Sequence, residues 1–300
     1  MADSSSVTLV TVVGDLVEDV VVWTAGPTRA GTDNPAVIRR SRGGSGANVA
    51  VAVAAAGTAV RFIGRVGNDA AGCALEQDLA AAGVETLLQR DGRTGCVVVL
   101  VDAAGERTMF PDRAAAAELG AIAVDDLGGT DVLHLPLYGF LEPAAADHLR
   151  AAAATVRGGG GRITIDLSAS SAIDHLGPAA VAALIGELAP AIVFANVDEA
   201  AAARLTSMEP PSEGCFVVKA GPDPATIVHH DGRRELVAPA PIAGVRDTTG
   251  AGDVFAGTFI AHWTAGATPA AACTAAHRAA AATHGTAGAP PGRPHRGGAP

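Results

Sequence analysis

The feature that most constrains the fold is a regular alternation between two kinds of segment. One kind is short and rich in Val and Ile, as at residues 60–66, 163–165 and 192–195, and has the length and composition of a buried strand. The other kind is rich in Ala, as at residues 70–82 and 143–156, and favours a helix. Strands that alternate with helices form parallel βαβ units. We therefore predict an α/β protein with three layers.

Two segments fall outside this alternation. Residues 17–42 and 93–113 contain strand-like runs, and no helical segment lies within either of them. In the second segment, residues 96–102 and 107–110 have the pattern of a hairpin. We expect the two segments to form a small separate sheet that acts as a lid.

The composition is that of a globular protein with a large core. Of 300 residues, 49% are hydrophobic and 17% charged, which suffices for one large domain or two small ones. Aromatic residues make up only 3%, so the core must consist mainly of Ala, Val, Leu and Ile. The four cysteines form no CxxC pair, and we expect buried thiols rather than metal ligands or disulfides.

Charge and hydropathy argue against several classes of partner. The net charge is −10 and no cluster of Lys or Arg stands out, which argues against nucleic acids and anionic membranes. The polar start lacks a signal-peptide core, and no apolar run reaches membrane-spanning length. We therefore expect a cytoplasmic protein. Residues 287–300 are rich in Gly, Pro and Arg, so we predict a domain of residues 1–290 and a disordered tail at 291–300.

The most informative local motif is DTTGAGDVFAGTF at residues 247–259. Gly250 and Gly252 flank one alanine, and Asp253 then begins an apolar run that can form a helix. A turn of small residues lets backbone N–H groups approach a ligand, and the start of a helix attracts anions such as phosphate. A carboxylate there can accept a proton from an attacking hydroxyl. The alternative is a glycine-rich turn with Asp253 as a helix N-cap.

A second glycine-rich stretch, GGSGAN at residues 43–48, precedes the helix-like residues 49–56. It is neither a Walker A loop nor a GxGxxG motif. Asn48 would lie in the first helical turn, where its amide can bind ligand hydroxyls; the alternative is a capping residue. Asp15 follows the strand-like residues 7–13, and strand ends are where open α/β sheets bind ligands. It could equally serve only to turn the chain.

These two stretches resemble the N-terminal and C-terminal signatures of the ribokinase-like (PfkB) family of sugar and nucleoside kinases. The segments RFIGRVGNDAAG, GERTMF and FANVDEA are also similar to family members, and the resemblance covers residues 7–288. It implies a ribokinase-like fold, in which helices flank a mostly parallel central sheet and a small β-sheet lid covers the sugar.

The resemblance also implies roles for individual residues. Asp253 matches the catalytic base, and the backbone amides of Gly250, Ala251 and Gly252 match the anion hole that holds the transferring phosphoryl group. The positions that bind the hydroxyls of the phosphate acceptor correspond to Asp15, Gly44 and Asn48.

On the nucleotide side, Asn196 and Glu199 match an NxxE element associated with Mg²⁺ and the phosphates. Glu199 could instead be an ordinary acid in a first helical turn. Lys219 and Gly221 fall in the nucleotide-binding region with Gly252, although Pro222 replaces a glycine that relatives carry there.

Three further assignments follow from the resemblance. Asp247 and Thr249 match contributors to a K⁺ site in some members. Residues 269–283 correspond to a helix beside the adenine, where His277 is either a ligand or, as we expect, a surface residue. Relatives carry Asn and Arg after the aspartate that matches Asp166, and this chain does not; Arg107 and Arg113 are candidate replacements from the lid, or else solvated.

We therefore predict an ATP- and Mg²⁺-dependent kinase, with K⁺ as a candidate activator, acting on a hydroxyl of a small sugar or sugar acid. A nucleoside kinase is the alternative, and an aromatic ring would then stack on the base. The candidate rings are Trp23, Phe110, Tyr138 and Phe140. A non-catalytic sugar- or nucleotide-binding relative and a dinucleotide-dependent oxidoreductase are further alternatives, although the second lacks GxGxxG. An exposed lid edge would permit a homodimer.

Overall fold

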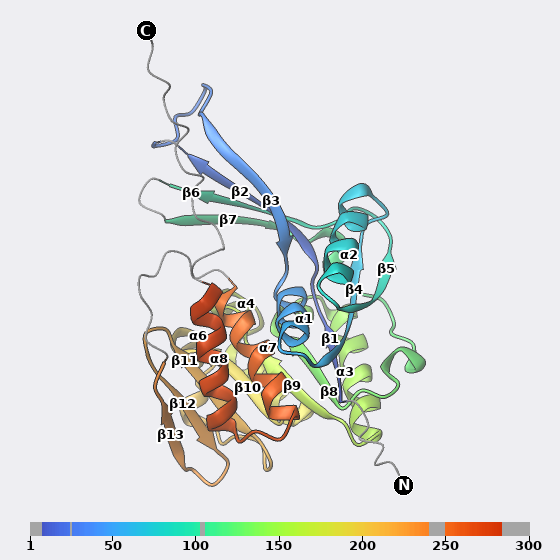
Figure 1. The fold of residues 1–300 in the computed structure, drawn as a ribbon, viewed down its shortest axis with the longest axis vertical. Coiled ribbons are helices and arrows are strands. Elements are labelled where there is room, and N and C mark those ends of the chain that lie inside the picture. The colour runs from blue at the N-terminus through green and yellow to red at the C-terminus, as the bar shows by residue number, and fades with distance from the viewer. Residues whose placement is uncertain (1–7, 25, 103–105, 240–249, 284–300) are drawn as a thin grey trace.

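The computed structural model of the chain describes residues 8–24, 26–102, 106–239 and 250–283, which form two sheets and the helices around them (Figure 1). The larger sheet has nine strands in the order β13-β12-β11-β10-β9-β8-β1-β4-β5. All strands from β11 to β5 pair in parallel, and only β12 and β13 are antiparallel to their neighbours. The strands are β1 (Leu9–Val13), β4 (Ala59–Val66), β5 (Glu85–Arg90), β8 (Val132–Pro136), β9 (Arg162–Asp166), β10 (Ile192–Asn196), β11 (Cys215–Ala220), β12 (Asp223–His229) and β13 (Arg234–Val237).

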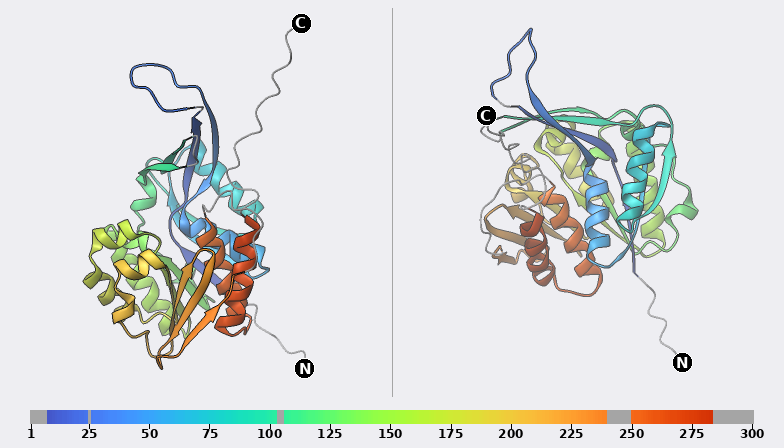
Figure 2. Two further views of the ribbon diagram at one scale, coloured as in Figure 1. Left: turned by 90° about the vertical axis from the view of Figure 1, so that its left-hand side faces the viewer. Right: turned by 45° about the horizontal axis from the view of Figure 1, so that its top comes forward.

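Helices cover both faces of this sheet, which gives the three layers that the sequence predicts (Figure 2). One core cluster joins the sheet to α1 (Ser45–Ala55), α2 (Ala70–Ala81), α7 (Ala251–Thr264) and α8 (Pro269–Thr283). The other joins it to α3 (Pro143–Gly158), α4 (Ser170–Leu176), α5 (Pro178–Leu188) and α6 (Val197–Ala202). Successive residues of a strand alternate between the clusters: Phe194 belongs to the first, and Val193 and Ala195 belong to the second. Strands buried on both faces read as continuous apolar runs, as observed here.

The smaller sheet projects from the body above α1 (Figure 1). Its four strands are β3 (Ala36–Gly43), β2 (Val17–Thr24), β6 (Cys96–Val101) and β7 (Arg107–Asp112), in that spatial order. β2 pairs with β3 in antiparallel and with β6 in parallel, and β6 and β7 form the expected hairpin. We call this four-stranded sheet the lid sheet. Because β1 leads into β2 and β3 leads into α1, the lid sheet is attached at the edge where the parallel strands end.

Two elements were missed by the sequence patterns. β5 is an edge strand with the sequence ETLLQR, in which two central leucines give little periodic signal. α4 has only seven residues and buries Ala172 and Ile173. Four short 3₁₀ helices complete the described elements: η1 (Ala114–Ala117), η2 (Val124–Leu127), η3 (Leu137–Phe140) and η4 (Leu205–Ser207).

Two sequence expectations concerned cysteines and membranes. All four cysteines are free, and Cys215 and Cys273 are buried as expected, but Cys73 is exposed and Cys96 partly exposed. Their positions on the outer part of α2 and on the lid sheet explain the difference, because neither element is covered on all sides. Within the described ranges, no helix has both the length and the apolar character that crossing a membrane requires.

Candidate active site

The predicted site residues follow the carboxyl ends of the parallel strands. Asp15 follows β1, Asp166 ends β9, Asn196 ends β10 and Lys219 lies near the end of β11. The N-termini of α1, α6 and α7 carry the other predicted residues of the described chain, apart from Gly221 in the turn after β11 and His277 in α8. A parallel sheet brings strand ends to one edge, so residues distant in sequence meet there.

Asp253 is the third residue of α7, and its carboxylate is held by two side chains of α1. Its Oδ1 accepts a hydrogen bond from Ser45 Oγ at 2.8 Å, and its Oδ2 accepts one from Asn48 Nδ2 at 2.9 Å. Burial raises the pKa of Asp253 to about 7, against the opposing effect of the two hydrogen bonds. The N-cap of α7 is Gly250, at φ 73°, so the alternative in which Asp253 caps the helix is wrong.

Close packing of α7 on α1 makes these hydrogen bonds possible. A Cβ atom on Gly257 would lie 2.5 Å from the backbone O of Val49 and 2.6 Å from the Cβ of Ala52. Only glycine therefore fits at this crossing. The contact of the two helices sets the distance between Asn48 and Asp253.

Arg42 orients the Asn48 amide. Its Nη1 donates to Asn48 Oδ1 at 2.7 Å, and its Nε donates to Asp78 Oδ2 on α2 at 2.8 Å. Because the Asn48 amide oxygen accepts a hydrogen bond from the Arg42 guanidinium, the amide nitrogen points toward Asp253. Sequence reasoning missed Arg42, Ser45 and Asp78. Only the position of Ser45 within the GGSGAN stretch offered a signal.

Asp15 lies on the lid side of the site and is only 8% exposed. Its Oδ1 accepts a hydrogen bond from Gly46 N at 3.1 Å, and its backbone O accepts one from Ala47 N at 3.2 Å. Gly44 allows this approach, since it has φ 100° and a Cβ atom there would lie 2.3 Å from the backbone O of Asp15. The start of α1 is thus folded onto Asp15.

Arg113 reaches the same place from the end of the lid sheet. Its Nη1 lies 3.3 Å from Asp15 Oδ2, and its guanidinium carbon lies 3.9 Å from the centre of the Tyr138 ring. Burial raises the pKa of the Tyr138 hydroxyl. Tyr138 is thus the aromatic candidate that lies beside Asp15. Phe140 is buried in the core, whereas Trp23 and Phe110 lie on the lid sheet.

Lys219 brings a positive charge to the start of α7. Its Nζ donates to Asp166 Oδ2 at 2.9 Å and lies 3.4 Å from the position that a Cβ atom of Gly252 would take. Burial works against the charged form, but Asp166 and Glu199 outweigh it and raise the pKa of Lys219. The ammonium therefore lies beside Gly252, one of the residues that the family resemblance assigns to an anion hole.

Glu199 caps its own helix. It forms a capping box with Asn196, in which Asn196 N and Nδ2 donate to its two carboxylate oxygens at 2.8 and 2.7 Å. Burial, and next to it the charge of Asp166, raise the pKa of Glu199. These contacts match the alternative role of a helix-terminal acid. Within the described ranges, no group of three or more His, Cys, Asp or Glu side chains could hold a metal ion.

A family model described as pfkB family carbohydrate kinase matches residues 7–296. The chain belongs to this family. It is therefore a carbohydrate kinase, an enzyme that phosphorylates a sugar or a related acceptor with ATP as donor, as its two glycine-rich stretches predicted.

Relatives and solved structures agree with this membership. The ATP-dependent ribose-1-phosphate kinase of Halopiger xanaduensis is 30% identical over 234 residues, 75% of this chain and 74% of that protein. The bifunctional protein HldE of Pseudomonas fluorescens is 30% identical over 270 residues, 86% of this chain but 56% of the relative, so this chain spans about half its length.

Among solved structures, the adenosine kinase from Sinorhizobium meliloti has a TM-score of 0.82 and 25% identity, over 94% of this chain and 95% of that chain. A protein described as ribokinase II from E. coli, in complex with ATP and Mg²⁺, has a TM-score of 0.77 and 23% identity, over 92% of each chain.

Other predicted residues of this pfkB kinase have mixed outcomes. Gly221, at φ 59°, and Pro222 form the tight turn between β11 and β12. His277 is not a surface residue: it is 8% exposed, packs edge-on against Phe255 with ring centres 5.2 Å apart, and burial lowers its pKa. It is buried because α8 packs directly on α7. Asp247 and Thr249 lie outside the described residues, as does the predicted tail.

The segment after Asp166 keeps that carboxylate in the site. Ser168 has φ 64°, its N donates to Asp166 Oδ1 at 2.8 Å, and its Oγ donates to the Asp166 backbone O at 3.0 Å. Such a conformation is unfavourable for a residue other than glycine, so the local turn is strained. The chain lacks the Asn and Arg that relatives carry after this aspartate. Asp166 is nevertheless held in the site by Ser168 and pairs with Lys219.

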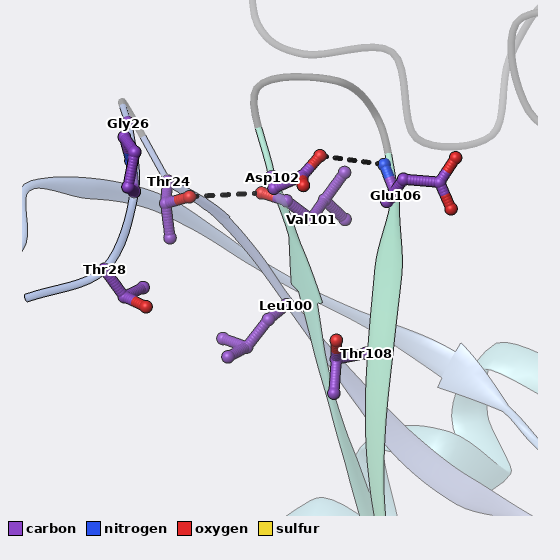
Figure 3. Close-up of a pocket in the computed structure, with 9 residues that line it drawn as sticks. Thr24, Gly26, Thr28, Leu100, Val101, Asp102, Glu106 and Thr108 are labelled. Atoms are coloured by element: carbon purple, nitrogen blue, oxygen red, sulfur yellow. Dashed lines mark hydrogen bonds between the residues drawn. The ribbon is translucent and has the colours of Figure 1, made fainter.

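A surface pocket lies elsewhere. It has a volume of about 290 Å³ and lies at the far end of the lid sheet, between Thr24, Thr28, Leu100 and Thr108 (Figure 3). None of the predicted catalytic or substrate-binding residues lines it. We therefore do not regard this pocket as a candidate active site for the kinase reaction.

Proposed function

We propose that this kinase transfers the γ-phosphoryl group of ATP to a hydroxyl of a small sugar-like acceptor, with Asp253 as the base. The observation that carries this proposal is the setting of Asp253: a carboxyl with a pKa of about 7, on the first turn of α7, held by Asn48 and Ser45. A base with a pKa near the working pH combines a useful ionised fraction with a useful proton affinity.

The acceptor binds beside Asp15 and Asn48. A carboxylate has about four lone-pair positions, so Asp253 can accept a further hydrogen bond from the acceptor hydroxyl while Asn48 and Ser45 remain bound. Asp253 takes the proton of that hydroxyl as the hydroxyl oxygen attacks the γ-phosphorus. The bond between the γ-phosphorus and the oxygen that leaves with ADP then breaks. The amides at the start of α7 and the Lys219 ammonium stabilise charge on the transferring phosphoryl oxygens.

Mg²⁺ fits the nucleotide side of the site. This ion is usually bound by phosphates, water and one or two carboxylates. Asp166 lies on that side with Lys219, and Glu199, whose two oxygens accept hydrogen bonds from Asn196, would act on the ion indirectly. When bound with ATP, Mg²⁺ would neutralise phosphate charge. The E. coli ribokinase II complex with ATP and Mg²⁺ supports this part of the proposal. A K⁺ site at Asp247 and Thr249 stays a prediction.

The lid sheet closes the acceptor side in this proposal. Residues 17–42 and 93–113 belong to one kinase domain of residues 1–290 and exclude water from the reacting groups. The lid sheet also carries large exposed apolar side chains, and such surfaces favour association. These side chains, which support a homodimer through the lid sheet, are Val37, Ile38, Met109 and Phe110. A cytoplasmic location stays a prediction.

A sugar acceptor is favoured over a nucleoside. The Arg113 guanidinium stacks on the Tyr138 ring, so that ring face is not open to a base. The relative named as a ribose-1-phosphate kinase supports a sugar acceptor as well.

ADP release at fixed ATP and Mg²⁺, measured over sugars, sugar phosphates, sugar acids and nucleosides, tests the proposal. The key variant is Asp253→Asn, and Asp147→Asn on the exposed part of α3 is the matched control. We expect acceptor-dependent ADP release that Asp253→Asn lowers by about 10²–10⁴ and Asp147→Asn preserves. Binding of ATP and acceptor without ADP release would instead identify a non-catalytic binding protein.

A further inference from the structure

Arg113 is the basic side chain that contacts Asp15 at the acceptor end of the site. The chain has a net charge of −10, and the described site already contains the carboxylates of Asp15, Asp166, Glu199 and Asp253. Lys219 is paired with Asp166 on the nucleotide side. A positive charge on the acceptor side therefore needs an explanation beyond phosphate transfer.

The position of Arg113 is fixed by its surroundings. The next residue, Ala114, has φ 42°, which is unfavourable for a residue with a Cβ atom. Ala115 N donates to Arg93 O at 3.1 Å, and a Cβ atom on Gly95 would lie 2.3 Å from the backbone O of Arg113. The backbone is thus packed tightly where β7 ends. The Tyr138 ring then supports the guanidinium from one face.

The guanidinium retains donors for a ligand. An arginine has five N–H donors, and Asp15 engages Nη1 through a long contact of 3.3 Å. Within the part of the chain that the structure describes, the Arg113 side chain has no further hydrogen bond or ion pair. Its side chain is 24% exposed, so the guanidinium is not sealed off from a ligand that binds beside Asp15.

We propose that Arg113 selects acceptors that carry an anionic group, a phosphate or a carboxylate. Its guanidinium binds that group, while Asp15 accepts hydrogen bonds from the acceptor hydroxyls. Both anions present two or more oxygens in the spacing that a guanidinium matches with parallel hydrogen bonds. This inference rests on the proposed function, because it names the acceptor class of the same site.

A simpler role would be to neutralise Asp15. That role predicts that neutral and anionic sugars bind with equal affinity. It also predicts that any loss of affinity in an Arg113 variant is the same for both. Selection predicts that the loss falls on anionic acceptors. The ratio between matched acceptors therefore separates the two roles.

The test uses binding and turnover on the same matched acceptors. Isothermal titration measures Kd for ribose, ribose 1-phosphate, ribose 5-phosphate, glucose and gluconate with the wild type, Arg113→Gln, Arg113→Lys and Arg93→Gln. Arg93 is a suitable control because it precedes the same lid hairpin and pairs with the exposed Asp112. Thermal unfolding of each variant checks that it is folded.

We expect an anionic sugar to bind the wild type more tightly than its neutral partner. Arg113→Gln should reduce this preference about 10- to 100-fold, as loss of a charge-assisted, bidentate contact would. Arg113→Lys should retain part of it, and Arg93→Gln all of it. A preference confined to sugar phosphates or to the sugar acid identifies which anion is recognised.

Three results would overturn the inference: equal binding of neutral and anionic sugars, no binding of any anionic sugar, or a preference that survives in Arg113→Gln. ADP release with the same sugars separates this inference from the kinase proposal. Turnover of neutral sugars without a preference for anions refutes the inference alone. An Arg113-dependent preference in binding, with no ADP released from any sugar, refutes the kinase proposal alone.

Discussion

Arg42→Gln tests whether the charged contact to Asn48 sets the pKa of the base. Arg42 holds the Asn48 amide oxygen at 2.7 Å, and the Asn48 amide nitrogen donates to Asp253 at 2.9 Å. That second hydrogen bond lowers the pKa of Asp253 against the larger effect of burial. Without Arg42 the amide is less well oriented, the hydrogen bond weakens, and the pKa of Asp253 rises.

The size of the effect follows from the pKa of about 7 in the wild type. Weakening the hydrogen bond by about 0.7–1.4 kcal/mol raises the pKa by about 0.5–1 unit. At pH 7 the ionised fraction of Asp253 then falls from about one half to about 0.1–0.25, so activity falls about two- to fivefold. At pH 9 almost all of the carboxyl is ionised in both proteins, and the difference should nearly vanish.

The assay is the pH dependence of kcat/KM for the acceptor between pH 6 and 9, because kcat/KM reports groups of the free enzyme. Arg40→Gln is the matched control, since Arg40 lies on the same strand but pairs with Glu18. Arg42→Lys, which keeps the charge, should show a smaller shift. An equal loss of activity at every pH would refute the reasoning, because it would indicate a structural role for Arg42 without an effect on the base.

Three further predictions follow from the same contacts. Lys219→Met should lower kcat about 10²–10³-fold, the usual loss for a donor to the transition state, and steady-state kinetics that show only a higher KM for ATP would contradict that role. Gly44→Ala should lower the unfolding free energy by about 1–3 kcal/mol, because it places a Cβ atom 2.3 Å from the Asp15 backbone at φ 100°; an unchanged melting temperature would contradict this. Asp253→Asn should stabilise the protein at alkaline pH, by on the order of 2–4 kcal/mol, because it removes a partly buried carboxylate whose pKa is raised from 3.8 to about 7. In the folded state the carboxyl keeps its proton up to a higher pH than in the unfolded state, so this stabilisation should be small below pH 4 and grow as the pH rises to about 7. Thermal unfolding of both proteins at pH 5 and pH 8 measures it. A smaller stability difference between variant and wild type at pH 8 than at pH 5 would contradict the prediction.

Local patterns were enough to predict most of the fold. The central strands are continuous apolar runs because both faces are covered, and α8 (Pro269–Thr283) has the predicted bounds. β5 escaped because an edge strand needs fewer apolar residues. His277 was wrongly expected at the surface, since an alanine-rich helix has no clear polar face and gives no sign of which side packs on α7.

The candidate site could be predicted only where glycine-rich turns mark it. The GGSGAN and GAGD stretches identify α1 and α7 as its walls, and Asn48 and Asp253 do meet although they lie 205 positions apart. The contacts of Arg42 and Arg113 depend on how the lid sheet joins the large sheet. Asp15 and Arg113 are 98 positions apart, and no periodic pattern relates two such residues.

The most direct test of the account is the pH profile of kcat/KM for wild type and Asp253→Asn. The account predicts that wild-type activity rises with pH through an apparent pKa of about 7, and that Asp253→Asn lowers kcat by about 10²–10⁴ and removes this dependence. Wild-type turnover in Asp253→Asn, or the same rise with pH in both proteins, would show that another group is the base.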